Sequence, residues 1–371
     1  MFQSRKLLDK LFEKQKNGNN HMILNHSDKI WIMPSCNINI GLNLYQPSTL
    51  KGRILKRCLY IFKNSEFLLK KMGAKRESLL LNSEIKKYLS QVLDIEDFFV
   101  AAYMGDASSK QNDKVTLQIY NNREIIAYAK VTMNEEVKGN FQAEIQALKF
   151  LEEKKIQHIP QIPASTDING MMIFVQTTQK PLNQKVSLAF GKEHISFIDD
   201  IVRKTRKEMQ YESTNFYQYI QYLKGVMEQF NITQREVLQE TIDKIESYLK
   251  KGTHEYAFSH GDYTPWNVYY TGNDINLFDF EYCSDAMPCY IDVFHYLTQM
   301  SLLGYRNDVD KTIKIYKKHE KLLEKFIKDT KFTYLCYLIY IISFYKKRTE
   351  EEAENIQEKY SQWIDIIKGL D

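Results

Sequence analysis

The stretch that decides the fold is FSHGDYTPWNVYYTGNDINLFDFE, which covers residues 258–281. An apolar approach leads into a polar loop, and two short strand-like runs follow, separated by the turn at residues 271–274. A hairpin at this turn folds the chain back on itself. We therefore expect Asp262, Asn267 and Asp279 to converge at one edge of a small sheet, with three oxygen-bearing side chains facing one pocket.

These three residue types suit phosphoryl transfer. Its transition state needs little covalent help, but it does need positioned reactants and neutralised charge. An aspartate can accept the proton of an acceptor hydroxyl, while an amide oxygen and a second carboxylate hold Mg2+, which prefers oxygen ligands and keeps several waters. We predict that Asp262 is the catalytic proton acceptor and that Asn267 and Asp279 are the metal ligands.

Two runs carry a family resemblance. HGDYTPWN, followed by LFDFEY, resembles the aminoglycoside phosphotransferase and choline kinase family. Asp292 in the later run PCYIDVFH resembles a family position that is mainly structural. The resemblance implies an α+β, two-lobed protein-kinase-like fold with a small antiparallel-sheet lobe and a larger, mostly helical lobe. It extends over residues 97–371, and residues 1–95 lie outside it.

Changes in composition and pattern along the sequence predict three parts. Residues 1–95 are expected to form a basic α/β extension of unknown role, residues 96–178 the kinase-like N-lobe, and residues 179–371 the helical C-lobe with the catalytic loop. Hydrophobic periodicity predicts the local elements. Strand-like runs are expected at residues 29–33, 41–45, 98–104, 115–120 and 124–132, and helices at residues 50–72 and from Phe141 to Leu151.

The resemblance also implies a lysine on the third strand of the antiparallel meander and a glutamate on the helix that follows. Lys130 occupies that strand position, and Glu144 is the candidate partner, with Glu135 and Glu136 as rivals. Glu144 is expected to orient Lys130 toward the phosphates of ATP or GTP, and Lys130 is expected to bind them.

Two further nucleotide-binding segments follow from the same resemblance. The turn over residues 105–110 takes the place of a phosphate-covering loop, although it has a single glycine, and Ser108 and Ser109 are its candidates. The polar connection that includes Gln176 and Thr178 is expected to be the hinge that recognises the base through backbone groups.

Other residues near the motif have simpler interpretations. His260 and Gly261 are expected to serve loop geometry, since a histidine beside a carboxylate is more often a structural donor than a catalyst. Trp266 could stack on a substrate ring or brace the loop, and bracing is favoured. Glu281 could lie near the metal or the acceptor, or pair with a neighbouring cation.

Composition limits the alternatives. The chain has 371 residues, of which 43% are hydrophobic and 26% charged, as in a folded globular protein. Its net charge of +4 gives no support for nucleic-acid binding. The five cysteines include no C-x-x-C pair, which argues against a disulfide framework and a zinc site. No export signal or membrane span is recognisable, so a cytoplasmic location is expected.

Positive charge is concentrated near the N-terminus. Residues 51–77 hold nine Lys or Arg and two Glu, with apolar residues between them. This stretch could be a basic amphipathic helix that contacts an anionic membrane surface or substrate, or a helix packed on the rest of the protein with a solvated cationic face. The second interpretation is favoured on sequence alone.

The sequence thus predicts an enzyme: a Mg2+-dependent phosphotransferase that moves the γ-phosphate of ATP or GTP to a hydroxyl of a small-molecule, sugar or glycan-precursor acceptor. The alternative is a nucleotide-binding pseudokinase scaffold that recruits a partner through the basic N-terminal region. A protein kinase ranks last, because the H-R-D arginine and the DFG motif are missing. The sequence predicts no oligomeric state.

Overall fold

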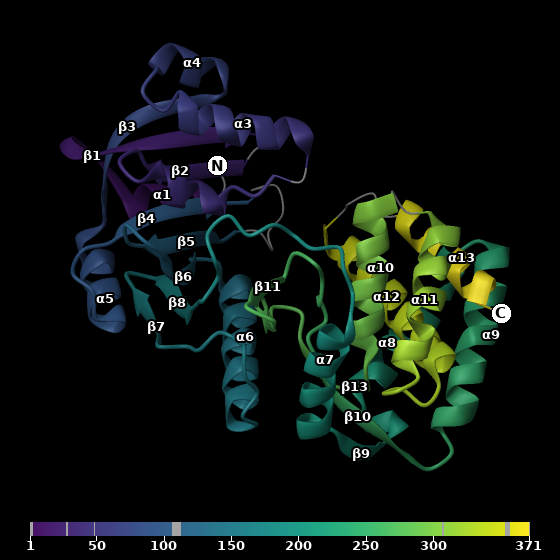
Figure 1. Cartoon of the computed structure of the whole chain (residues 1–371). Coiled ribbons are helices and arrows are strands. Elements are labelled where there is room, and N and C mark those ends of the chain that lie inside the picture. The colour runs from purple at the N-terminus through teal and green to yellow at the C-terminus, as the bar shows by residue number, and fades with distance from the viewer. Residues whose placement is uncertain are drawn as a thin grey trace. The chain divides into compact units, whose positions relative to one another are not determined.

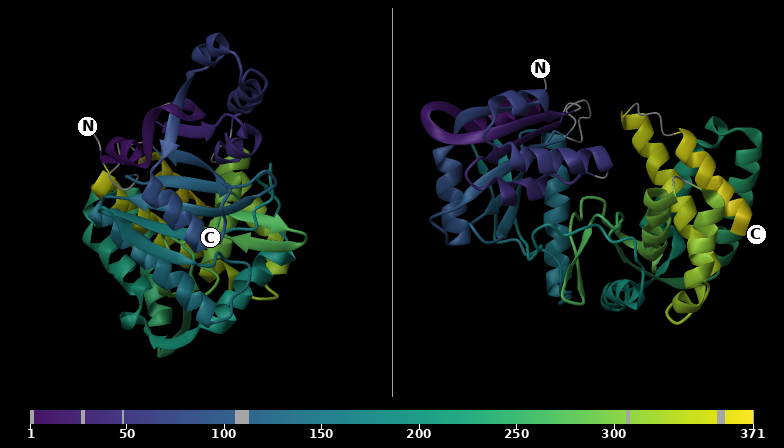
Figure 2. Two further views of the ribbon diagram at one scale, coloured as in Figure 1. Left: turned by 90° about the vertical axis from the view of Figure 1, so that its left-hand side faces the viewer. Right: turned by 45° about the horizontal axis from the view of Figure 1, so that its top comes forward.

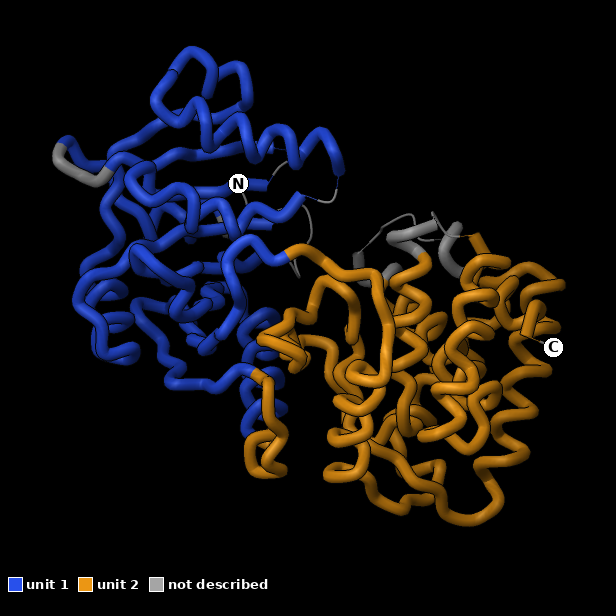
Figure 3. The backbone as a smooth tube through the Cα atoms, viewed as in Figure 1, with its two compact units in different colours: residues 1–149, 160–184 blue, residues 150–159, 185–371 orange. Residues whose placement is uncertain are grey.

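The computed structural model of the chain describes residues 3–26, 29–47, 49–105, 113–305, 308–352 and 357–370. These residues form two compact units (Figure 3). The first unit comprises residues 1–149 and 160–184, and the second comprises residues 150–159 and 185–371.

An eight-stranded sheet forms the centre of the first unit (Figure 1), and Figure 2 presents it from two further directions. Its strand order is β3-β1-β2-β4-β5-β6-β8-β7, and each neighbouring pair is antiparallel. The strands are β1 (Phe12–His26), β2 (Lys29–Pro34), β3 (Ala74–Leu81), β4 (Phe99–Met104), β5 (Val115–Tyr120), β6 (Ile125–Thr132), β7 (Ala164–Ile168) and β8 (Met171–Thr177). The three strands expected between residues 98 and 132 are therefore confirmed as β4, β5 and β6.

Residues 1–95 contribute β1, β2 and β3 to this sheet. Strand β2 pairs with β4, with Ile30 opposite Met104 and Ile32 opposite Ala102. The boundary expected at residue 95 thus falls inside the first unit, within a shared sheet. A separate role for residues 1–95 stays a prediction.

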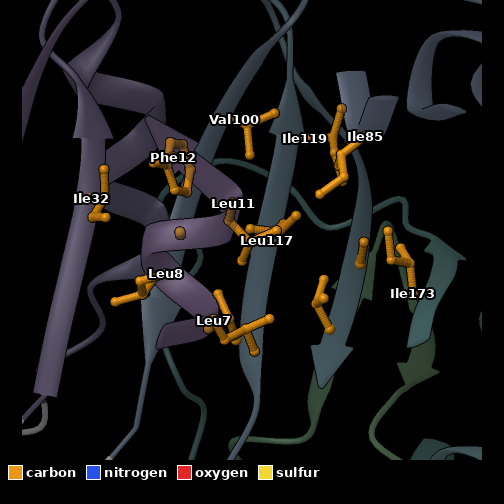
Figure 4. Packing of buried hydrophobic residues seen from close by; sticks show 14 of the residues in the cluster. Leu7, Leu8, Leu11, Phe12, Ile32, Ile85, Val100, Leu117, Ile119 and Ile173 are labelled. Atoms are coloured by element: carbon orange, nitrogen blue, oxygen red, sulfur yellow. The ribbon is translucent and has the colours of Figure 1, made fainter. Parts of the chain in front are cut away.

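Both faces of the sheet are covered by helices of the first unit. They are α1 (Gln3–Leu11), α2 (Ile38–Gly41), the 3-10 turn η1 (Leu42–Leu44), α3 (Leu50–Ile61), α4 (Glu66–Lys71), α5 (Ser83–Leu93) and α6 (Glu135–Glu153). On one face, Leu7 and Leu11 of α1 pack with Leu117 of β5 and Ile85 of α5 (Figure 4). On the other face, α2 and η1 pack with Trp31 and neighbouring strand residues.

Two local predictions for residues 1–95 are wrong. The segment at 41–45, expected as a strand, lies in the helical turns α2 and η1, because its closely spaced apolar side chains pack together on the sheet. The helix expected over 50–72 is two helices. Thr49 caps α3 by accepting from the Gly52 amide, and Ser65 caps α4 by accepting from the Leu68 amide, so a second helix starts where the first has ended.

The second unit is mostly helical and holds two small sheets. Its helices are α7 (Lys192–Thr205), η3 (Tyr211–Ser213), α8 (Asn215–Gly225), η4 (Met227–Gln229), α9 (Ile232–Leu249), α10 (Ile291–Tyr305), α11 (Val309–Leu323), α12 (Thr330–Glu352) and α13 (Gln357–Leu370). One sheet has the order β13-β10-β9, from Ser284–Pro288, Thr253–Ser259 and Lys207–Gln210, and β11 (Val268–Thr271) pairs with β12 (Asp274–Leu277). Within the described residues, no helix has the length and apolar character needed to cross a membrane.

The expected α+β fold class, with an antiparallel-sheet unit and a larger, mostly helical unit, is confirmed. The hairpin expected at residues 271–274 is confirmed too, because Thr271 of β11 lies opposite Asp274 of β12. It returns the chain from the polar loop after β10 toward Asp279.

Candidate active site

The polar loop after β10 is held by one buried carboxylate, Asp292, in the first turn of α10. Its Oδ1 accepts hydrogen bonds from the Ser259 hydroxyl at 2.9 Å and the Gly261 amide at 3.0 Å, and its Oδ2 accepts from the His260 amide at 2.8 Å. Three consecutive residues are thus fixed by one side chain. This geometry indicates that Asp292 stabilises the loop, which is the structural role expected for it.

Glycine at position 261 is required by the fold of the loop. Its φ of +78° lies in the left-handed region, and a Cβ there would approach the carbonyl oxygen of Tyr282 to 2.1 Å. The loop therefore passes directly against the segment that follows the hairpin, and any side chain at Gly261 would separate the two.

His260 is a structural neighbour of the site, as expected. Its Nδ1 accepts from the Asp262 amide at 3.2 Å, and its Nε2 lies 3.2 Å from the carbonyl oxygen of Phe278. This arrangement fits a neutral ring with its proton on Nε2. Burial also lowers the pKa of His260, against the opposing effect of the nearby carboxylates. A ring whose two nitrogens are both engaged is a poor general base.

Asp262 is more accessible than the two side chains that donate hydrogen bonds to it. Its Oδ2 accepts from Nδ2 of Asn267 at 2.7 Å, and its Oδ1 lies 3.1 Å from Nε2 of His295. The side chain of Asp262 is 24% exposed, whereas His295 is 3% and Asn267 is 4% exposed. Two buried donors thus orient a carboxylate that remains open on another side.

The hairpin brings Asp279 to this group through the residue before it. The Phe278 amide donates to the carbonyl oxygen of Asn267 at 3.1 Å, and the Phe278 carbonyl lies against His260. Asp279 itself has a φ of +70°, which aspartate tolerates better than most residues. The expected convergence of Asp262, Asn267 and Asp279 therefore rests on backbone contacts in the described chain.

The donor set fits a hard divalent cation. Because Nδ2 of Asn267 donates to Asp262, Oδ1 is the atom of Asn267 left to contact a cation, and the carboxylate of Asp279 is the second candidate ligand. Among the described residues, no group of three or more His, Cys, Asp or Glu could hold a metal ion. A site of one amide oxygen and one carboxylate suits Mg2+, whose coordination is completed by phosphates and water.

The first unit holds the other expected pair. Nζ of Lys130 on β6 lies 2.9 Å and 2.7 Å from the two carboxylate oxygens of Glu144 on α6. The side chain of Glu144 is fully buried and that of Lys130 is 10% exposed. The rivals Glu135 and Glu136 are exposed, and Glu135 pairs with Lys138. Burial and bidentate geometry thus single out Glu144.

The remaining nucleotide candidates are distributed differently. Ser108 and Ser109 lie outside the described residues. Gln176 lies within β8, and its Nε2 donates to Oε1 of Glu144 at 2.8 Å. The Thr178 hydroxyl accepts from the Lys180 amide at 3.1 Å. The side chain of Gln176 thus belongs to the Lys130–Glu144 group, whereas its role in a hinge stays a prediction.

Two residues of the site were missed by sequence reasoning. His295 lies three residues after Asp292 on α10, so both side chains face the loop, and the run PCYIDVFH contained this signal. Nδ1 of His295 lies 3.2 Å from the hydroxyl of Tyr337 on α12. Nothing in the local sequence marks Tyr337, which is 42 residues away.

Trp266 and Glu281 lie at the edges of the loop and hairpin. Trp266 is exposed and Glu281 is half-buried. The exposed fraction of Trp266 is 37%, so stacking on a substrate ring and bracing the loop both stay predictions.

Comparison with known proteins gives structural matches only. No protein-family model and no curated protein matches the sequence. An aminoglycoside phosphotransferase in complex with ADP and hygromycin B matches at 10% identity, over 77% of this chain and 98% of that one, with a TM-score of 0.49. An ADP-bound aminoglycoside phosphotransferase matches at 15% identity (78% and 98% of the chains, TM-score 0.43), and amicoumacin kinase with AMP-PNP and Ca2+ at 12% (69% and 86%, TM-score 0.43). Aminoglycoside phosphotransferases are among the proteins whose solved structures match this chain.

Proposed function

We propose that the protein is a phosphotransferase that moves the γ-phosphate of ATP or GTP to a hydroxyl of a small-molecule, sugar or glycan-precursor acceptor. The proposal rests on the surroundings of Asp262. Its carboxylate is partly exposed and is oriented by two buried donors, Asn267 and His295. Such a group is oriented for proton acceptance and remains reachable by a substrate.

In the proposed reaction, the acceptor hydroxyl binds at the open side of Asp262. Its oxygen forms the new bond to the γ-phosphorus while its proton passes to the Asp262 carboxylate, and the bond from the γ-phosphorus to the bridging oxygen breaks, releasing the nucleoside diphosphate. Hydrogen bonds from Asn267 and His295 fix the carboxylate in one rotamer, which reduces the entropy lost in reaching the reactive geometry.

His295 acts as a positioning residue in this scheme. A carboxylate only accepts hydrogen bonds, so Nε2 of His295 carries the proton, and Nδ1 accepts from the Tyr337 hydroxyl. The Tyr337 hydroxyl thus selects the tautomer that donates to Asp262.

The nucleotide phosphates are assigned to two groups of residues. Lys130, oriented by Glu144, supplies a positive charge to the phosphates. Asn267 and Asp279 would hold Mg2+, which neutralises phosphate charge in this chemistry.

The alternative, a nucleotide-binding pseudokinase scaffold, is favoured by one observation. Lys130, Tyr128 and Gln118 point to the same face of the sheet, and part of this face is covered by residues 38–45. The Gln118 amide donates to the carbonyl oxygen of Ile40 at 3.0 Å, and the Tyr128 hydroxyl donates to Gln118 at 3.4 Å. A cover on this face would restrict access to Lys130, which would slow phosphate transfer without affecting recruitment of a partner at the basic N-terminal region.

Label transfer from γ-labelled ATP or GTP, with Mg2+ and a cell extract as acceptor source, tests the proposal. We expect labelling by the wild type and a loss of at least about 100-fold in Asp262→Asn, because a general base contributes roughly 10²–10⁴-fold. Asp274→Asn is the matched control, since Asp274 is an exposed carboxylate in the hairpin turn. Undiminished labelling by Asp262→Asn would contradict the assignment, and nucleotide binding without labelling by the wild type would favour the scaffold.

A further inference from the structure

Helices α3 and α4 carry an unusual set of exposed apolar side chains. Six large ones between residues 50 and 67 are at least 39% exposed: Leu50 (69%), Ile54 (53%), Tyr60 (49%), Ile61 (66%), Phe62 (39%) and Phe67 (67%). Single exposed apolar residues are normal on a protein surface, whereas apolar side chains that gather on one exposed face mark interaction sites.

The exposed residues of α3 form a stripe. Leu50, Ile54 and Ile61 recur at spacings of four and seven, which places them on one side of a helix. Leu59, which is fully buried, lies on the opposite side and packs against the sheet. Helix α3 is therefore apolar on the face that holds it to the protein and also on the face that points to solvent. Basic side chains are exposed on the same helix, so the interpretation favoured from sequence, a packed helix with a solvated cationic face, agrees with part of this surface.

Positive charges border the stripe. Exposed basic side chains of this region are Lys51, Arg53, Arg57, Lys70, Lys71 and Lys75. Of the two acidic residues, Glu77 is already paired with Lys14 and Lys75, and Nζ of Lys71 lies 4.5 Å from the ring centroid of the exposed Phe67. We call the exposed apolar and basic side chains of residues 50–75 the basic-apolar surface.

We propose that the basic-apolar surface binds the headgroup region of an anionic lipid bilayer. Apolar side chains flanked by Lys and Arg match that environment, because aliphatic and aromatic groups enter the acyl boundary while the long cationic side chains reach the lipid phosphates. Anionic lipid attracts each nearby positive charge, whereas a second copy of the same surface would repel it. Charge complementarity thus selects a negatively charged partner over self-association.

Co-sedimentation of the full chain with vesicles tests the proposal. We expect binding to vesicles of phosphatidylcholine mixed with phosphatidylserine, little binding to phosphatidylcholine alone, and weakening as salt rises. Because the assay measures binding rather than phosphate transfer, its result is independent of the proposed enzymatic function.

Two variants separate the apolar and the charged contributions. Ile54→Ser with Ile61→Ser, and Arg57→Glu with Lys70→Glu, should each lower the vesicle association constant by at least tenfold. All four side chains are exposed, so the fold should be unaffected, as circular dichroism would verify.

Matched controls come from the second unit. Ile232→Ser removes a side chain that is 67% exposed, and Lys317→Glu with Lys318→Glu reverses two exposed charges on α11, so wild-type binding is expected for both. Three results would overturn the proposal: no binding to anionic vesicles, undiminished binding by the surface variants, or a dimer in lipid-free ultracentrifugation that Ile54→Ser with Ile61→Ser dissociates. The last result would make the surface an interface between copies.

Discussion

Glu144 in the first unit and Asp262 in the second are both carboxylates held by hydrogen bonds, yet their surroundings differ. Glu144 is fully buried and accepts from a lysine through both oxygens and from an amide through one of them. Asp262 accepts from an amide and a histidine, and a quarter of its side chain is exposed. The first carboxylate faces a full positive charge in the protein interior, and the second faces donors that leave it open.

The difference in burial suggests different roles: a buried carboxylate stabilises the fold, and a partly exposed one can take part in a reaction. A buried ion pair is costly to break from one side, because the remaining charge is left without solvent or partner. A partly exposed carboxylate can lose its partners to water at small cost, and it keeps room for a substrate. We therefore expect variants of Glu144 to affect stability first, and variants of Asp262 to affect turnover first.

The largest expected effect is on the stability of the first unit. Glu144→Ala should lower its free energy of unfolding by about 3–5 kcal/mol, because Lys130 is left buried without its counter-charge. Asp262→Ala should cost the second unit less, about 1–3 kcal/mol, because the lost carboxylate is partly exposed although His295 is left without its acceptor. Urea titration followed by hydrogen exchange, resolved by peptide, measures the two units separately.

A second pair of substitutions shows whether the charge causes the loss. Lys130→Met with Glu144→Leu removes both charges and should regain most of the stability lost in Glu144→Ala. An equal cost of Glu144→Ala and Asp262→Ala would remove the distinction between the two carboxylates.

The next expected effect is a difference between the two units in how their stability depends on pH. Burial lowers the pKa of His194 from 6.5 to about 4, against the opposing effect of Glu193, and burial also lowers the pKa of His260. Both histidines lie in the second unit. The unfolded chain therefore binds more protons than the folded one between about pH 6.5 and pH 4, so stability is present above this window and is lost as pH falls through it.

For His194 alone this loss amounts to about 3 kcal/mol. Urea midpoints measured at pH 7 and pH 4.5 should fall more for the second unit than for the first. His194→Gln should flatten that dependence, since it removes the titrating ring. A second unit that keeps its midpoint at pH 4.5 would show that His194 remains protonatable in the folded state.

Much of both carboxylate sites was predictable because the signals are local. The motif HGDYTPWN and the turn at 271–274 each lie within a few residues, and they indicated Asp262 and Asn267. Lys130 followed from the family resemblance, which implies a lysine on the third strand of the meander. The family position favoured Glu144 over Glu135 and Glu136. The residue types alone could not separate the three, and the burial of Glu144 in the structure does.

Long-range contacts account for what the sequence did not reveal. Strands β1 to β3 join the sheet through the pairing of β2 with β4. Whether β4 has a free edge for this pairing depends on the whole sheet and cannot be predicted from the local sequence. The helical form of residues 41–45 depends on packing against that sheet. Tyr337 reaches His295 only because α10 and α12 pack together.

A smaller effect is expected at His295, which supports Asp262 without contacting a reacting atom. His295→Leu should lower kcat by roughly 10- to 100-fold, with the KM for nucleotide unchanged, because the carboxylate loses one of its two orienting donors. His295→Gln keeps an amide donor of similar reach and should recover most of the activity. Equal loss in both variants, or a change confined to KM, would indicate a structural role only.

The smallest effect is expected at Gln176, which shares Glu144 with Lys130. Gln176→Leu should lower the free energy of unfolding of the first unit by about 1 kcal/mol, since Lys130 still engages both oxygens of Glu144 and only a neutral donor is lost. If the backbone of this segment recognises the base, the KM for nucleotide should stay within about threefold of the wild type, because a side-chain substitution leaves the backbone donors and acceptors in place. Thr178→Val is the control for a polar substitution in the same segment. A loss as large as that of Glu144→Ala would mean that Gln176, rather than the charge of Lys130, is what keeps Glu144 buried.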